Sequence, residues 1–121
     1  MAEGLSSPAA DLALAPVLSA YTWIKLHTGA PGSAGTANAA TETTRKQATW
    51  AAASGGASSN TGALSWTGVA GSEDYTHFSA WSASTAGTFG FSGLITANAV
   101  TSGDNFTIPT GDLDVAFPLA S

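Results

Sequence analysis

The chain has 121 residues with no cysteine, eight Asp or Glu, three Lys or Arg, and a formal net charge of -5 at pH 7. The lack of cysteine excludes disulfides and thiolate metal sites, and three cations are too few to neutralise a run of phosphates, so we expect no nucleic-acid binding. Charged residues make up only 9% of the chain, against about 25% in a typical soluble domain. This composition fits an ordinary domain with an uncharged surface or, as we favour, a subunit that packs against identical copies or a larger assembly.

Targeting signals are not visible in the sequence. No apolar run approaches the roughly 20 residues that a membrane-spanning helix needs. The N-terminus lacks the basic start and long apolar stretch of a secretory signal peptide. We therefore expect no membrane partner and no export by that route.

The N-terminal residues 1–20 are predicted to form a short arm that is helical in part. Within SSPAADLALAPVLSA, Ser7 is expected to be the N-cap and Pro8 the first helical residue, while Leu12 and Leu14 lie among alanines. Pro16 is expected to end or kink this helix. We predict that the arm docks on a neighbour or on the body of the domain.

From residue 21 the pattern changes to the two-residue period of a strand. In residues 21–27 (YTWIKLH), Ile24 and Leu26 share one face, and Tyr21, Trp23, Lys25 and His27 share the other. A long loop rich in Gly and Ala is expected over residues 28–44. Further strands are predicted at residues 46–52 and 63–69, separated by turn-forming residues.

An aromatic hairpin is predicted next, over residues 75–95 (YTHFSAWSASTAGTFGFSGLI). Phe78 and Ala80 face one way, and His77, Ser79 and Trp81 face the other. Phe89, Phe91, Gly93 and Ile95 are expected on one face of the returning strand.

Two last short strands are predicted at residues 105–108 and 113–117. In the second, Leu113, Val115 and Phe117 point inward, whereas Asp112 and Asp114 point out. Short strands at regular spacing predict an all-β fold, an antiparallel β-sandwich or a jelly-roll-like barrel of about seven to eight strands. We assign residues 21–121 to a single β-domain.

Residues with catalytic or metal-binding chemistry are sparse. Glu73 and Asp74 lie close to His77 in sequence and could orient its ring or bind a metal, although a histidine in a strand is more often simply hydrogen-bonded. Asp104, Asp112 and Asp114 could chelate a hard cation such as calcium, but outward carboxylates more often keep a sheet soluble. The serine-hydrolase motif GxSxG is absent. We therefore predict no catalytic residues, no metal site and no cofactor.

Four tryptophans lie within the predicted strands: Trp23, Trp50, Trp66 and Trp81. Several exposed on one face could bind a sugar, but large aromatic side chains in strands are more often core or subunit contacts. The residues predicted to contact other copies or a capsid are Leu12, Leu14, Val17, Leu18, Trp23 and Trp81.

Four segments together resemble a family of small virion proteins of tailed bacteriophages, whose members are labelled tail-fibre-like, head-fibre or minor tail proteins. The segments are residues 21–38 (YTWIKLHTGAPGSAGTAN), 45–66 (RKQATWAAASGGASSNTGALSW), 76–97 (THFSAWSASTAGTFGFSGLITA) and 100–117 (VTSGDNFTIPTGDLDVAF). The combination of LHTGxPG, THFxxW and GDxFxIPxGxLxV is more specific than any one piece. The resemblance implies a non-enzymatic β-domain, made in the host cytoplasm and built into the virion as a homotrimer.

The leading hypothesis is a capsid decoration or head-fibre-type protein whose partners are copies of itself and the major capsid protein. The alternative is a minor tail protein at the tail tip or baseplate, with tail proteins as partners. A second alternative, from another functional class, is a carbohydrate-binding module that contacts the host surface through exposed tryptophans.

Overall fold

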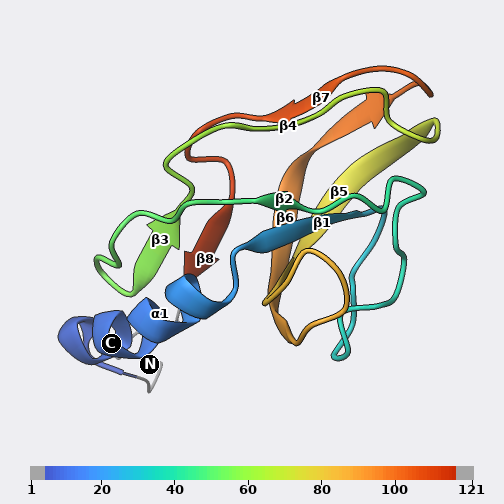
Figure 1. Cartoon of the computed structure of the whole chain (residues 1–121). Coiled ribbons are helices and arrows are strands. Elements are labelled where there is room, and N and C mark those ends of the chain that lie inside the picture. The colour runs from blue at the N-terminus through green and yellow to red at the C-terminus, as the bar shows by residue number, and fades with distance from the viewer. Residues whose placement is uncertain (1–4, 117–121) are drawn as a thin grey trace.

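The computed structural model describes residues 5–116, except for the side chains of residues 96–98. It contains one helix and eight strands within this range (Figure 1). In chain order they are α1 (Ser7–Ala20), β1 (Trp23–His27), β2 (Lys46–Gln47), β3 (Ala57–Ser59), β4 (Leu64–Trp66), β5 (Glu73–Trp81), β6 (Phe89–Val100), β7 (Phe106–Ile108) and β8 (Asp114–Ala116).

The strands form three antiparallel sheets. The largest has the order β2-β1-β5-β6, and two smaller pairs are β3-β8 and β4-β7. Figure 1 shows β4 and β7 crossing over one side of the large sheet, and the β3-β8 pair lying beside helix α1. The predicted all-β, antiparallel, sandwich-like fold is confirmed.

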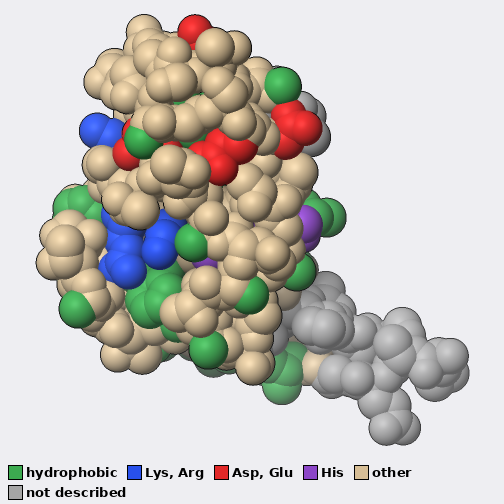
Figure 2. Space-filling model, turned by 90° about the vertical axis from the view of Figure 1, so that its right-hand side faces the viewer, with side chains coloured by type: hydrophobic (Ala, Val, Ile, Leu, Met, Phe, Trp, Pro, Cys, Tyr) green, Lys and Arg blue, Asp and Glu red, His purple; other side chains and the backbone are tan. Residues whose placement is uncertain are grey.

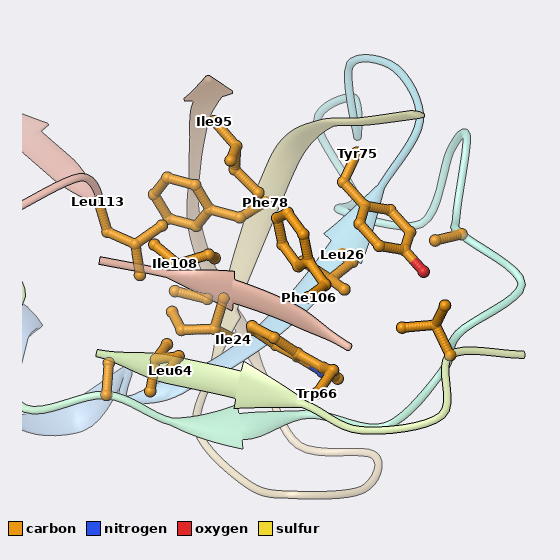
Figure 3. Packing of buried hydrophobic residues seen from close by; sticks show 14 residues of the cluster. Ile24, Leu26, Leu64, Trp66, Tyr75, Phe78, Ile95, Phe106, Ile108 and Leu113 are labelled. Carbon is orange, nitrogen blue, oxygen red and sulfur yellow. The ribbon is translucent and has the colours of Figure 1, made fainter. Parts of the chain in front are cut away.

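The hydrophobic core lies between the large sheet and the β4-β7 pair (Figure 3). Strand β1 contributes Ile24 and Leu26, because its two-residue period places them on the same face. Antiparallel pairing sets Leu26 opposite Phe78 of β5. From the other side, Trp66 and Phe106 come from paired positions on β4 and β7, and their rings are 5.9 Å apart.

Helix α1 differs from its prediction at both its cap and its proline. The N-cap is Ser6, whose Oγ accepts a hydrogen bond from the Ala9 N–H at 3.3 Å. Pro16 was expected to end or kink the helix. It does not end the helix, which continues to Ala20. Proline has no backbone N–H to donate to the Leu12 carbonyl. Both residues are exposed, so this carbonyl lies on the solvent side of the helix. No helix among the described residues is long and apolar enough to cross a membrane.

Several predicted strands are shorter than expected, whereas β5 and β6 extend beyond the predicted hairpin, and one aromatic residue faces the other way. The strand predicted over residues 46–52 is reduced to β2 and a single bridge between Trp50 and Asn60. Between Ala80 and Trp81 the β5-β6 register shifts. As a result Phe89 packs on Trp81 while Phe91 packs on Phe78, so the prediction that they share a face was wrong.

The last strand follows the predicted alternation in part. Leu113 is fully buried, Val115 is half-buried, and Asp112 and Asp114 are exposed. Phe117, which we also expected to point inward, lies outside the described residues.

Candidate functional site

A buried histidine and serine, 52 residues apart in the sequence, meet on neighbouring strands. His27 Nε2 lies 2.7 Å from Ser79 Oγ, and His27 Nδ1 lies 2.9 Å from the carbonyl oxygen of Ala37. Because a carbonyl oxygen only accepts, Nδ1 carries the proton and Nε2 accepts from the serine hydroxyl. The Trp81 Nε1–H donates to the same Ser79 Oγ at 2.7 Å. We call these three side chains the His27 network.

The His27 network has the serine-to-histidine distance of a hydrolase without the access that catalysis requires. His27 and Ser79 are both 0% exposed, and the Ser79 hydroxyl donates to one partner and accepts from another. Burial lowers the pKa of His27 from 6.5. The hydrogen bond to the Ala37 carbonyl acts in the opposite direction, and the positive charge of nearby Lys25 lowers the pKa further. A neutral ring is the form that the network needs. The network therefore serves to join β1, β5 and the loop over residues 28–44.

A second contact fixes the connection between β5 and β6. The Arg45 guanidinium lies 4.4 Å above the Trp81 ring, and its Nη1 donates to the carbonyl oxygens of Ala83 at 2.9 Å and Ala86 at 2.7 Å. Burial lowers the pKa of Arg45. Two of the donors of this cation are thus used to hold a turn.

Two carboxylates hold the loops beside the other end of β5. Glu73 Oε1 accepts from the Thr41 N–H at 2.7 Å, and the buried Glu42 accepts from the N–H groups of Thr44 and Ala70. Tyr75 is fully buried nearby, and its hydroxyl has no hydrogen-bond partner. Burial, and then the charges of Glu73 and Glu42, raise the pKa of Tyr75 to about 12. Figure 3 shows this hydroxyl pointing away from the centre of the core.

The structure does not bring together the residues of the predicted histidine site. His77 Nδ1 lies 2.9 Å from Thr76 Oγ1. The carboxylate of Glu73 is bonded to the loop at Thr41 instead, and Asp74 is exposed.

The three candidate aspartates are also separate in their contacts. Asp104 Oδ2 accepts from the Thr101 N–H at 3.0 Å, while Asp112 and Asp114 are exposed near β8. Within the described part of the chain, no group of three or more His, Asp or Glu side chains is placed to hold a metal ion.

The four tryptophan side chains differ in their solvent exposure. Trp66 is 1% exposed, and its Nε1–H donates to the Thr44 carbonyl oxygen at 2.7 Å. Trp81 is buried beneath Arg45, whereas Trp23 and Trp50 are half-buried. The rings therefore do not form one exposed platform.

The residues predicted to contact other copies fall into different surroundings. Leu12 is 77% exposed, Val17 and Trp23 are half-buried, and Leu14, Leu18 and Trp81 are buried within the chain. Beside α1 lies a groove of about 420 Å³, which we call the α1 groove; its lining residues are Asp11, Ala15, Leu18, Ser19, Trp50 and residues 51–53. Asp11 Oδ1 accepts from the Gly56 N–H at 2.7 Å and ties the helix to the segment before β3.

Sequence reasoning missed the His27 network and the Arg45 contact. The alternation in β1 and β5 put His27 and Ser79 on the faces opposite the core, but the pairing that brings them together depends on a register that the sequence does not display. Arg45 was noted only as one of three cations. Its partners are backbone carbonyls, which carry no side-chain signature.

The described surface is poor in charge and in large exposed apolar side chains. In Figure 2, uncharged polar side chains and backbone cover most of the face shown, and Lys, Arg, Asp and Glu appear in a few small groups. Only three large hydrophobic side chains are exposed among the described residues, those of Leu5, Leu12 and Leu94.

Comparison with known proteins supplies the family. A family model described as podophage GP4 fiber I protein gp80 matches residues 12–116, which include all eight strands. No curated protein matches the chain. The match agrees with the resemblance carried by the four sequence segments. The chain belongs to the podophage GP4 fiber I protein gp80 family, and it is a phage virion structural protein that associates with other virion components.

Proposed function

We propose that the chain is a capsid decoration protein of the head-fibre type, which binds the capsid surface as a homotrimer. The single observation that carries this proposal is that the side chains of His27, Ser79 and Arg45 are hydrogen-bonded within the fold and serve its structure. Ser79 is 0% exposed and fully bonded, and Arg45 holds a turn. What remains for function is a weakly charged surface, which suits contact with copies of the chain and with the major capsid protein.

The division into an arm and a β-domain supports the same proposal. We assign attachment to residues 1–20 and the compact body to residues 21–121, made in the host cytoplasm. The main core cluster contains no residue of α1, so the helix is an addition to the core rather than a part of it. Deleting residues 2–20 is therefore expected to leave a folded domain that no longer joins particles.

Electron cryo-microscopy of purified virions tests the location directly. Density for this domain repeated over the capsid lattice would support decoration, whereas density confined to the tail tip would overturn it in favour of a minor tail protein. Particles assembled with the deleted chain provide the matched comparison. Unchanged incorporation of that variant would contradict the role of the arm.

A further inference from the structure

His27 is buried on the side of the large sheet that faces away from the core. It follows Leu26, a core residue, so the alternation of β1 turns its side chain to the opposite face. His27 is nevertheless 0% exposed. The loop that leaves β1 and returns to β2 (Figure 1) contacts it twice, through the bond from Nδ1 to the Ala37 carbonyl and through a backbone bridge to Ala39. We attribute the burial of His27 to this loop.

The same loop contacts the sheet at a second point, Gly35. A Cβ at this position would clash with the ring of Phe89, so the glycine backbone lies directly against that ring. Phe89 packs in turn on Trp81, with the ring centroids 5.5 Å apart, and Trp81 belongs to the His27 network. The middle of the loop is therefore held to the sheet by a hydrogen bond to His27 and by packing on Phe89.

The hydrogen bonds of the His27 network require a neutral ring. Nδ1 already carries a proton, so further protonation would place a hydrogen on Nε2, which points at Ser79 Oγ. That oxygen can accept from Nε2–H as well as from the Trp81 N–H, but its own hydrogen then loses its acceptor. Protonation would thus create both a buried charge and a buried hydroxyl without an acceptor, and each is costly.

The charged groups around His27 do not compensate for a positive ring. The charged or titratable residues on β1, on β5, in the loop and over Trp81 are Lys25, Glu42, Arg45, Glu73, Asp74 and His77. Glu42 and Glu73 are bonded to backbone N–H groups beside the other end of β5, and Asp74 is exposed. Lys25 and His77 act on His27, and both lower its pKa.

We propose that His27 is a pH-sensitive contact, and that protonation of its ring releases residues 28–39 of the loop while the large sheet stays folded. Release hydrates the ring and uncovers Ser79 and Trp81 on this face. The released segment ends before Ala40, because Ala40 is part of the core and its N–H donates to the Leu26 carbonyl oxygen at 3.1 Å. The inference concerns a single chain and is independent of the proposed attachment to a capsid.

Amide hydrogen exchange of the full chain, followed by NMR between pH 7 and pH 5.5, tests the release. The reporter is the Thr28 N–H, which donates to the Asn38 carbonyl oxygen at 2.9 Å, and the reference is the most protected amides of β5. Protection is taken relative to an unstructured peptide at the same pH. We expect Thr28 to be less protected than β5 at pH 7, and its protection to fall by about tenfold for each pH unit below 6.5.

Two results would overturn the proposal. A Thr28 protection that is independent of pH would mean that the loop opens without exposing His27. A Thr28 protection equal to that of β5 at every pH would mean that the loop opens only with the whole domain. Both results come from the wild-type chain, so the test does not depend on any variant that fails to fold.

A pair of variants assigns the effect to one ring. His27→Gln retains a side chain that can donate and accept but cannot be protonated in this range, and it should make Thr28 protection independent of pH. His77→Gln is the matched control, because His77 is paired with His27 across β1 and β5, and it should keep most of the pH dependence. A pH dependence that survives His27→Gln and disappears in His77→Gln would assign the contact to the wrong histidine.

Discussion

The four-stranded sheet and helix α1 place their apolar residues in opposite ways. On the sheet, alternation sends Ile24 and Leu26 into a core that is closed by β4 and β7. On the helix, Leu14 is buried whereas Leu12, two residues earlier, is exposed. The apolar residues of the sheet are buried within one chain, whereas the helix leaves the side chain of Leu12 exposed.

Polar groups follow the same division. In the sheet, the fully buried side chains of Ser79 and His27 are hydrogen-bonded to each other. Their burial therefore leaves neither of them as an unpaired polar group. On the helix, the carboxylate of Asp11 accepts a hydrogen bond from the Gly56 N–H, which adds a polar tie to the packing of Leu14 and Leu18. Substitutions in the sheet should therefore change stability, and substitutions on the exposed side of the helix should change assembly.

The largest difference is expected between Trp66→Ala and Leu12→Ala. Trp66 is 1% exposed and packs against Phe106, so its truncation should lower the free energy of unfolding by about 3–5 kcal/mol. Leu12→Ala should change it by less than about 0.5 kcal/mol, as is usual for exposed positions. Urea denaturation of both variants checks the comparison. Equal losses would show that Leu12 contributes to the core of a single chain.

The next largest effect is expected when Ser79 is replaced by alanine. The change leaves the Trp81 N–H and His27 Nε2 without a partner in a buried place, and should cost about 2 kcal/mol or more. Ser65→Ala is a suitable control, because Ser65 is exposed and its hydroxyl lies 3.0 Å from that of the equally exposed Thr107. If the two serine variants unfold at the same urea concentration, the His27 network does not stabilise the fold as described.

Local pattern was enough to predict much of the sheet. Alternating residues in 21–27 and 75–95 identified β1, β5 and β6, and the inward Leu113 was also predicted correctly. Pattern failed where tertiary contacts decide the outcome. Phe89 changes face because of a register shift that lies in the pairing with β5, and helix α1 passes through Pro16 while Leu14 and Leu18 on its buried side hold it in place.

The candidate sites were harder to predict than the fold for a related reason. His27 and Ser79 become neighbours only through the β1-β5 register, and neither lies in a recognisable motif. The buried role of Glu42 also depends on backbone N–H groups from distant loops. The residue types in the sequence indicated which side chains could take part in binding or catalysis. Which of these side chains contact one another is determined by the fold.

A pH titration of stability separates His27 from the rest of the sheet. Its pKa is lowered on folding, so the unfolded chain binds the proton more tightly. The stability that neutral His27 confers is fully present above pH 6.5 and is lost as pH falls below 6.5 through the lower pKa of the folded state. The loss amounts to about 1.4 kcal/mol for each unit of pKa difference. His27→Gln should remove this slope between about pH 7 and pH 5.5. His77→Gln should keep most of it, because the charge of His77 is the smallest of the causes that lower the pKa of His27.

The smallest effect is expected for Tyr75→Phe, which removes the one unpaired buried side-chain atom found among the described residues. The ring packs edge-on against Phe106 at 4.8 Å, and phenylalanine retains that contact. Removing a buried hydroxyl without a partner should leave the free energy of unfolding unchanged or raise it by up to about 1 kcal/mol. Urea denaturation checks this prediction. If the free energy of unfolding falls by more than about 1 kcal/mol instead, the Tyr75 hydroxyl makes a stabilising hydrogen bond in solution. Water would then reach this end of the sheet, unlike the end that holds His27.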